Sequence, residues 1–360
     1  MFGQSIPLGF TGGGFAPSDN FNTVLYDGDG QSPRSITGVG FEPDFTWIRE
    51  RDQYAWHVLT DSVRGTTNAD SLFFNNQNTA ANSTAYRQYG HLSSFDSDGF
   101  TVTSGSSDWV NENNTTLVSW NWKGGGAAVT NNDGTVTSQV SANVAAGFSV
   151  VEYTGGGVAG TVGHGLDSAP ELIFLKRYTE GANYSSMRWL NYTESAPSNV
   201  RPYGHSPDEF YAPWFTSVKD NGVVTTPSAT VLNYSVTSNS YQQYDNVLQN
   251  NVDFKAYCWH SVENYQKISS YVGAGYGGTS VNVGFRPAFV MIRKTTAAGK
   301  WYMFDNKRLN GPYSYAIDNT SGLELSAFVE LTSTGFDVSD AYPDSLTDLN
   351  ITYVYMAIAE

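Results

Sequence analysis

Short runs in which apolar and polar residues alternate recur along the whole chain. In residues 117–122, single polar residues separate Val118, Trp120 and Trp122. A period of two places successive side chains on opposite faces of a strand, so these runs predict half-buried β-strands. No window longer than about ten residues carries the period of an amphipathic helix, and the best candidate for a short helix lies around residues 62–64.

One block of sequence occurs three times. Each copy begins with a glycine and a short turn, continues through a proline into an apolar strand, and ends in basic residues. The copies are residues 40–49, 165–177 and 284–294. Their starting glycines lie roughly 120 residues apart, which is the size of one small β domain. An aromatic strand follows each block and a strong strand closes each unit, so the pattern predicts three tandem units.

The fold class follows from these strands and turns. Short strands with frequent turns are typical of an antiparallel β-sandwich or jelly roll. We therefore expect an all-β protein of three tandem units of this type, related by the internal repeat. The expected parts are an N-terminal arm at residues 1–20, unit 1 at 21–123, a linker at 124–147, unit 2 at 148–265 with a loop insertion near 203–215, and unit 3 at 266–360.

The amino-acid composition agrees with this fold and excludes some classes of binding partner. Hydrophobic residues make up 40% of the 360 and charged residues only 15%, so Asn, Ser, Thr and Gly supply most of the polarity, which disfavours helices. The net charge is −15 and no run of Lys or Arg occurs, so we expect no nucleic-acid partner. Residues 1–5 lack the basic and apolar regions of a secretory signal, and no apolar run approaches a membrane span. We therefore expect synthesis in a cytoplasm and no membrane insertion.

Candidate chemistry is sparse. None of the five histidines stands in a metal-ligand spacing, and Cys258 lies in an apolar run where a buried, inert thiol is expected. Residues 27–30 and 96–99 look like the start of a calcium loop. The bidentate Glu that closes such a loop is missing, so we expect Asx turns, with a surface calcium ion as the alternative. We expect no enzyme, because no nucleophile motif, phosphate loop or dinucleotide fingerprint occurs, and we expect no catalytic residue, metal site or cofactor.

The best candidate for a ligand site is the Tyr- and Pro-rich insertion of unit 2. Its candidate glycan-binding residues are Trp214, Tyr211, Asp208 and Tyr203, because aromatic rings combine an apolar face with a polar end and carboxylates bind sugar hydroxyls. Long insertions in a β scaffold are also where binding concentrates. Packing against a neighbouring subunit is the alternative. Six other tryptophans lie inside strand patterns and are expected in cores or between units: Trp47, Trp120, Trp122, Trp189, Trp259 and Trp301.

Six segments carry a further signal, namely residues 38–48, 61–65, 94–100, 120–123, 161–166 and 353–360. They resemble a repeat found in structural proteins of marine tailed phages, especially cyanophages, which are often described as having concanavalin A-like or lectin-like domains. The resemblance implies a fibre, appendage or head-decoration protein located in the virion. It brings no catalytic residue with it.

Two readings of function follow. In the first, the chain is a non-enzymatic virion structural protein, such as a tail-fibre or appendage component or an adaptor, and residues 1–20 bind other virion proteins. In the second, the same scaffold is a lectin-like module that binds a host-surface glycan. Capsid head decoration is a further alternative. A homo-oligomer is expected, because phage fibres are commonly trimers and head decorations follow capsid symmetry.

Overall fold

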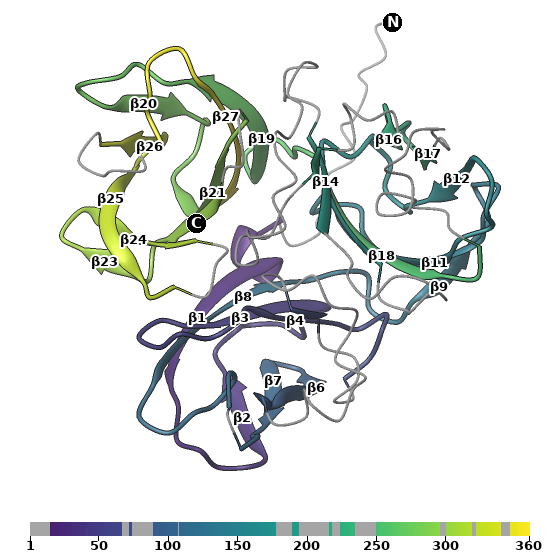
Figure 1. Ribbon diagram of the computed structural model, residues 1–360, viewed down its shortest axis with the longest axis horizontal. Coiled ribbons are helices and arrows are strands. Elements are labelled where there is room, and N and C mark those ends of the chain that lie inside the picture. Colours follow the sequence, from purple (N-terminus) through teal and green to yellow (C-terminus); the bar gives the residue numbers. More distant parts are fainter. Residues whose placement is uncertain are drawn as a thin grey trace, which may run out of the picture.

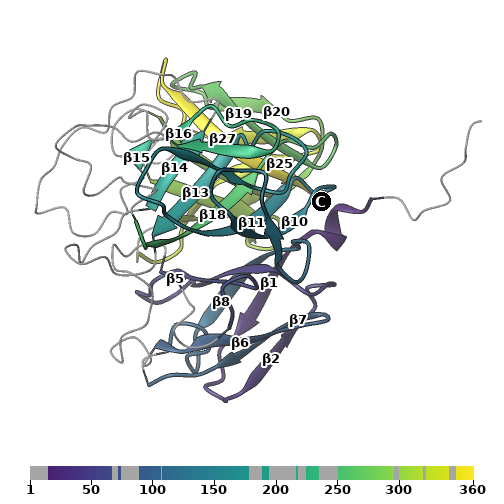
Figure 2. The same ribbon diagram turned by 90° about the vertical axis from the view of Figure 1, so that its right-hand side faces the viewer.

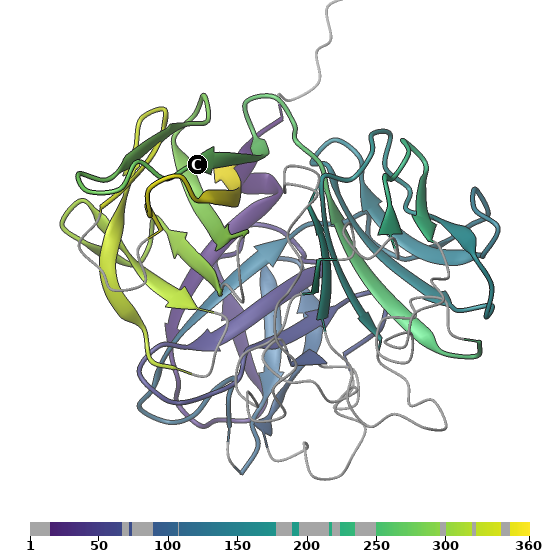
Figure 3. The same cartoon turned by 45° about the horizontal axis from the view of Figure 1, so that its top comes forward.

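The strands form three lobes around a common centre, coloured purple to blue, teal, and green to yellow along the chain (Figures 1 and 3). The computed structural model describes residues 15–66, 72–73, 89–106, 108–177, 189–193, 216–217, 224–234, 250–295, 300–318, 322–339 and 346–360. Within them the one helix is the 3-10 turn η1 (Pro17–Asp19), and none is long and apolar enough to span a membrane. The predicted all-β class with antiparallel, sandwich-type sheets is confirmed.

Unit 1 consists of a larger and a smaller sheet. The larger sheet has the order β1-β8-β3-β4-β5 and the smaller has the order β2-β7-β6. The strands are β1 (Phe21–Asp27), β2 (Arg34–Thr37), β3 (Phe45–Glu50), β4 (Val58–Asp61), β5 (Leu72–Phe73), β6 (His91–Asp96), β7 (Gly99–Thr103) and β8 (Thr116–Trp122). Residues 62–64 form a turn after β4, not the helix expected there, because their backbone and side chains bond to Asp44 and Asp61.

Unit 2 repeats this plan with a wider sheet. The larger sheet has the order β15-β14-β13-β18-β11-β10-β9, and the smaller has the order β12-β17-β16. The strands are β9 (Val129–Asn131), β10 (Ser138–Asn143), β11 (Phe148–Thr154), β12 (Gly160–Gly163), β13 (Leu172–Arg177), β14 (Trp189–Thr193), β15 (Thr216–Ser217), β16 (Val224–Thr225), β17 (Val231–Tyr234) and β18 (Asp253–Trp259). Residues 124–147, assigned to a linker from the sequence, contain β9 and β10, which extend this sheet at one edge.

Unit 3 forms one continuous nine-stranded sheet that curls round on itself. Its order is β19-β27-β21-β22-β24-β25-β26-β20, and β23 pairs with β24. The strands are β19 (Gln266–Val272), β20 (Thr279–Asn282), β21 (Pro287–Lys294), β22 (Trp301–Asp305), β23 (Leu309–Asn310), β24 (Tyr313–Asp318), β25 (Leu325–Thr332), β26 (Gly335–Val338) and β27 (Thr352–Ala359). Seen from the side, units 2 and 3 lie together above unit 1 (Figure 2).

The same strand order occurs in all three units. In each unit four strands lie side by side in the order first strand, closing strand, strand of the repeated block and aromatic strand. These are β1-β8-β3-β4 in unit 1, β11-β18-β13-β14 in unit 2 and β19-β27-β21-β22 in unit 3. The registers match as well. In unit 1, Phe45 of the block strand faces Trp122 of the closing strand. In unit 2, Leu172 faces Trp259 in the same way, and in unit 3 Phe289 faces Ile358.

A turn before each closing strand matches in atomic detail. The amide of Asn114 donates to the Gly28 carbonyl at 3.0 Å, and the same bond joins Asn251 to Gly155 and Asn350 to Gly273. All three asparagines have φ near +60° (63°, 58° and 61°), a conformation that Asn tolerates better than most residues. Each turn therefore crosses the glycine-rich loop after the first strand in the same way.

The closing strands are buried on both faces, so the prediction of half-buried strands was wrong for them. In β8 the polar side chains of Ser119 and Asn121 are as inaccessible as that of Trp120 between them. Asn121 satisfies its amide within the sheet, accepting from Thr46 Oγ1 at 3.0 Å and donating to the Asn22 carbonyl at 3.1 Å. One face lies against the smaller sheet of its own unit, and the other lies against the other units.

Candidate functional site

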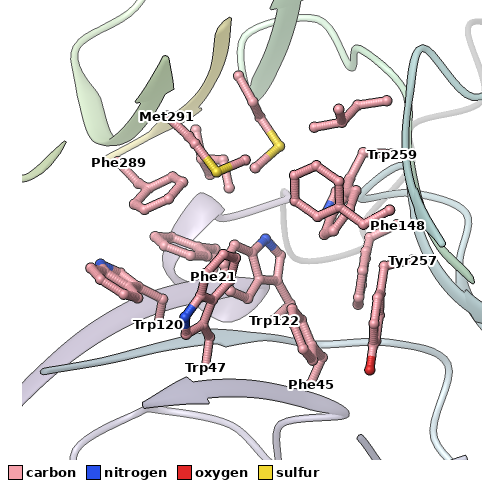
Figure 4. Close-up of a cluster of buried hydrophobic side chains, with 14 of the residues drawn as sticks. Phe21, Phe45, Trp47, Trp120, Trp122, Phe148, Tyr257, Trp259, Phe289 and Met291 are labelled. Atoms are coloured by element: carbon pink, nitrogen blue, oxygen red, sulfur yellow. The ribbon is translucent and has the colours of Figure 1, made fainter. Parts of the chain in front are cut away.

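The larger sheets of units 1 and 2 and the single sheet of unit 3 pack against one another. In β27, Val354, Met356 and Ile358 belong to a central cluster shared by all units, whereas Tyr353 and Tyr355 belong to the core of unit 3 alone. The alternation along the strand thus divides its side chains between two cores. Figure 4 shows the central cluster, in which rings from units 1 and 2 converge with Phe289 and Met291 of unit 3.

Trp122 lies where the three units touch. Its ring centroid is 5.2 Å from that of Phe45 in unit 1, 6.2 Å from that of Trp259 in unit 2 and 5.9 Å from that of Phe289 in unit 3. Edge-on arrangements dominate these contacts, as the quadrupoles of aromatic rings favour. The five tryptophans whose side chains are described among the six expected in cores are all buried here: Trp47, Trp120, Trp122, Trp259 and Trp301.

Two aspartates at matching positions bridge neighbouring units. Asp61 ends β4 and faces Phe45 across the sheet, and Asp305 ends β22 and faces Phe289 in the same register. Both accept a bond from the backbone amide three residues further on, at 2.9 and 3.0 Å. The other carboxylate oxygen of each reaches the next unit. Asp61 Oδ2 accepts from the Tyr257 hydroxyl at 2.8 Å, and Asp305 Oδ2 accepts from Trp120 Nε1 at 3.0 Å.

These two bridges are equivalent around the centre. Tyr257 faces Phe174 in unit 2, just as Trp120 faces Trp47 in unit 1. The contact from unit 1 to unit 2 and the contact from unit 3 to unit 1 therefore use equivalent positions. In each, an aspartate at the end of the aromatic strand bonds to a side chain on the closing strand of the other unit. The corresponding positions for unit 2 and unit 3 hold Thr193 and Met356, and there the units meet through apolar rings, with the centroids of Phe174 and Trp301 5.4 Å apart.

Buried charges accompany the contact between units 1 and 2. Lys255 Nζ lies 3.2 Å from Asp61 Oδ1 and 2.6 Å from Glu152 Oε2, and the side chains of Lys255 and Asp61 are fully buried. Lys176 faces Lys255 across the paired strands β13 and β18. Burial, and then the nearby charge of Arg64, lowers the pKa of Lys176 to about 7.

A second charged network joins units 1 and 3. Arg308 Nε lies 2.7 Å from Asp305 Oδ2, and its Nη1 lies 2.9 Å from Glu324 Oε1. Arg51 of unit 1 binds the other oxygen of Glu324 at 2.9 Å. The Arg308 guanidinium also lies 5.3 Å from the ring centroid of Trp120, which adds a cation–π contact.

The basic residues that end the repeated block point toward the centre. Arg49, Lys176 and Arg293 occupy matching positions, because each lies four residues after the first paired apolar residue of its strand. Burial lowers the pKa of Arg49 and of Arg293 to about 10. Arg49 donates to the backbone carbonyl of Glu50 in its own unit and to that of Gly322 in unit 3. Its guanidinium therefore links units 1 and 3.

The glycan-binding residues predicted from the sequence, Trp214, Tyr211, Asp208 and Tyr203, lie outside the described residues. Their predicted role stays a prediction.

The two calcium-like turns are built from the chain's own hydrogen bonds. Asp29 accepts from the amide of Gln31 and pairs with Arg34 at 3.3 Å, and Asp98 accepts from the amides of Gly38 and Gly40. Among the described residues, no group of three or more His, Cys, Asp or Glu side chains is placed to hold a metal ion. Asp29 thus forms the Asx turn expected at residues 27–30, whereas Asp98 bonds across to the loop at residues 38–40.

A shallow groove of about 390 Å³ lies along the β9–β10 hairpin. Val140, Ala142 and Leu166 form its floor, and Asn131 and Asp133 stand at its rim. These two polar side chains bond to each other, with Asn131 Nδ2 donating to Asp133 Oδ2 at 3.0 Å. The groove is therefore lined by a mixture of apolar and polar groups.

A family model described as a domain of unknown function, DUF7483, matches residues 16–360. The chain belongs to this family. The DUF7483 match runs through all three units, in agreement with the core that they share. No curated protein and no solved structure matches the chain.

Two repeated features of the DUF7483 chain were missed in the sequence analysis, one in the contacts between units and one in the turns before the closing strands. The Asp-x-x-Arg pattern occurs at residues 61–64 and 305–308, directly after the aromatic strands, and aligning the three copies would have revealed it. Likewise, an asparagine stands two residues before each closing strand, at positions 114, 251 and 350. The ion pair of Lys255 with Asp61 had no such signal, because 194 residues separate the partners.

Proposed function

We propose that the chain is a non-enzymatic structural protein of a tailed-phage virion, in which three diverged copies of one β unit are fused into a single three-lobed body. The observation that carries the proposal is the matching pair of bridges, Asp61 to Tyr257 and Asp305 to Trp120. They repeat between successive units as contacts repeat around a cyclic trimer. The location in a virion rests on the resemblance of residues 38–48 and the related segments to marine phage proteins.

An adaptor or appendage role suits this arrangement best. Three lobes related by approximate threefold symmetry offer one similar surface to each subunit of a trimeric partner, and phage fibres are commonly trimers. The charged pairs support the structural role, because Lys255 with Asp61 and Arg51 with Glu324 join different units. One chain would then serve one fibre trimer.

The first segment of the chain is proposed to dock on the partner. Residues 15–20 pack against the chain itself, where the Phe15 ring lies 4.8 Å from that of Tyr265 and Asn20 accepts from Asn143 at 2.8 Å. These contacts hold residues 15–20 against the three-lobed body. Residues 1–14 are therefore the part of the predicted arm that is proposed to bind another virion protein.

Quantitative mass spectrometry of purified particles tests the proposal. We expect the chain in the particles at one copy per three copies of a fibre protein, and cryo-electron microscopy should place its three lobes on a threefold axis. A chain that lacks residues 1–14 should fold normally but be missing from the particles. Absence of the full-length chain from purified particles would contradict a virion role. An equal number of copies of chain and fibre protein would contradict the adaptor role.

A further inference from the structure

Lys255, Asp61 and Glu152 form a compact group where unit 1 meets unit 2. The lysine nitrogen lies 3.2 Å from Asp61 Oδ1 and 2.6 Å from Glu152 Oε2. Lys255 and Asp61 are fully buried, whereas the Glu152 side chain is 28% exposed. Removing an ammonium and a carboxylate from water is costly even when they pair. Condensation of the two groups to an amide removes both charges and with them this cost.

The neighbouring side chains favour that condensation. The Tyr257 hydroxyl donates to Asp61 Oδ2 at 2.8 Å, which fixes the carboxyl group and can stabilise negative charge that develops on this oxygen during attack at Cγ. Lys176 faces Lys255 in the strand register, and like charges directly opposite each other are unfavourable. Condensation of Lys255 to an amide removes one of these two facing positive charges.

We propose that Lys255 and Asp61 form an intramolecular isopeptide bond, which joins unit 1 to unit 2 covalently, and that Glu152 transfers the proton. Glu152 takes a proton from the ammonium, and Nζ then attacks Cγ of Asp61. The bond between Cγ and Oδ1 breaks as Glu152 returns its proton to that oxygen. The second proton lost by the nitrogen completes a water molecule. No oxidant or reductant is needed, because the ammonium and carboxylate contain all the atoms of the amide and the water.

The structure supplies the conditions for this step without a separate enzyme. Holding the two reacting groups in contact replaces a bimolecular encounter with an intramolecular one. Glu152 is positioned for general acid–base transfer, and its partial exposure gives the water molecule a route to solvent. The bond would add to the virion role proposed above but does not depend on it.

The matching site between units 1 and 3 provides an internal control. Asp305 occupies the position of Asp61, but its partners are the Arg308 guanidinium and the Trp120 indole. A guanidinium stays protonated in proteins and an indole N–H is only a donor, so neither is a nucleophile here. Only the contact between units 1 and 2 is expected to form the bond.

Mass spectrometry of the intact, denatured full-length chain tests the proposal. The wild-type chain should be lighter than its sequence mass by one water molecule, and a protease digest should release a branched peptide linking Lys255 to Asp61. Lys255→Arg keeps the charge but removes the nucleophile, so it should restore the full sequence mass. Glu152→Gln should give the full mass or a much slower loss of water, and Asp305→Asn should still lose water.

Two results would overturn the proposal. One is a wild-type chain at its full sequence mass after incubation of the folded protein at neutral pH. The other is loss of water that persists in Lys255→Arg, which would place the dehydration elsewhere. Far-UV circular dichroism of each variant shows whether it folds. The wild-type measurement decides the question even where a variant does not.

Discussion

Replacing Trp122 with alanine tests whether the three units share one core. Its side chain is 2% exposed and contacts rings of all three units, including Phe45, Trp259 and Phe289. Truncating a buried tryptophan to alanine costs about 3–5 kcal/mol. Trp122 Nε1, however, is buried and has no hydrogen-bond partner among the described residues, a burden of about 1–3 kcal/mol that the substitution removes. The net loss in the free energy of unfolding should therefore be about 2 kcal/mol.

The phenylalanine variant separates these two contributions. Trp122→Phe keeps a ring and removes the unpaired N–H, so it should cost less than about 1.5 kcal/mol. Urea unfolding followed by circular dichroism measures both values.

Amide hydrogen exchange then shows which strands lose stability in Trp122→Ala. Trp122→Ala should speed exchange in β18 and β21 as well as in β8, because a shared core couples their opening. Phe100→Ala, within the core of unit 1 alone, should act mainly on unit 1. Faster exchange in unit 1 only, for both variants, would refute a shared core.

Other substitutions probe the charges and the proposed ligand site. Asp305→Asn should lower the free energy of unfolding by about 1.5–3 kcal/mol in chemical denaturation, because the buried Arg308 guanidinium loses one of its two carboxylate partners and keeps Glu324. Arg286→Ala, at an exposed ion pair, should change it by less than about 1 kcal/mol. Burial raises the pKa of Glu50 from 4.5 to about 8, so the folded chain keeps a proton that the unfolded chain releases, and stability from this group falls as the pH rises through that window. Glu50→Gln should flatten that part of the profile, and identical profiles would contradict the assignment. Trp214→Ala should abolish adsorption to host cells but leave assembly intact if the unit 2 insertion binds a glycan, and unchanged adsorption would count against it.

The sequence predicted strands and class because these depend on local pattern. Alternation at Val118, Trp120 and Trp122 defines two faces of a strand, and the glycines at 40, 165 and 284 all adopt the positive φ that their turns require, at 88°, 73° and 94°. Alternation does not reveal what covers each face. Asn121 looked solvent-facing because asparagine usually is, yet it is buried with its amide satisfied within the sheet.

Contacts between units were beyond prediction for a related reason. Asp61 and Lys255 are neighbours only because β4 of unit 1 lies against β18 of unit 2, and no local pattern specifies how separate sheets dock. Charged residues that end strands usually face solvent, so the basic residues after the repeated block gave no sign that they point inward. The repeat itself carried the missing information in part, since equivalent positions such as 61 and 305 make equivalent contacts.

Fusing three units into one chain allows each contact between them to differ. In a symmetric homotrimer all three contacts must be the same, so a substitution acts three times. Here one contact has Asp61 with Tyr257 and a buried lysine, another has Asp305 with Trp120 and a buried arginine, and the third is apolar. A unit docked at the wrong position would bury a charge without its partner, which is strongly unfavourable. The differing contacts thus favour one order of units around the centre, and they permit a lysine, and with it the proposed covalent bond, at one contact alone.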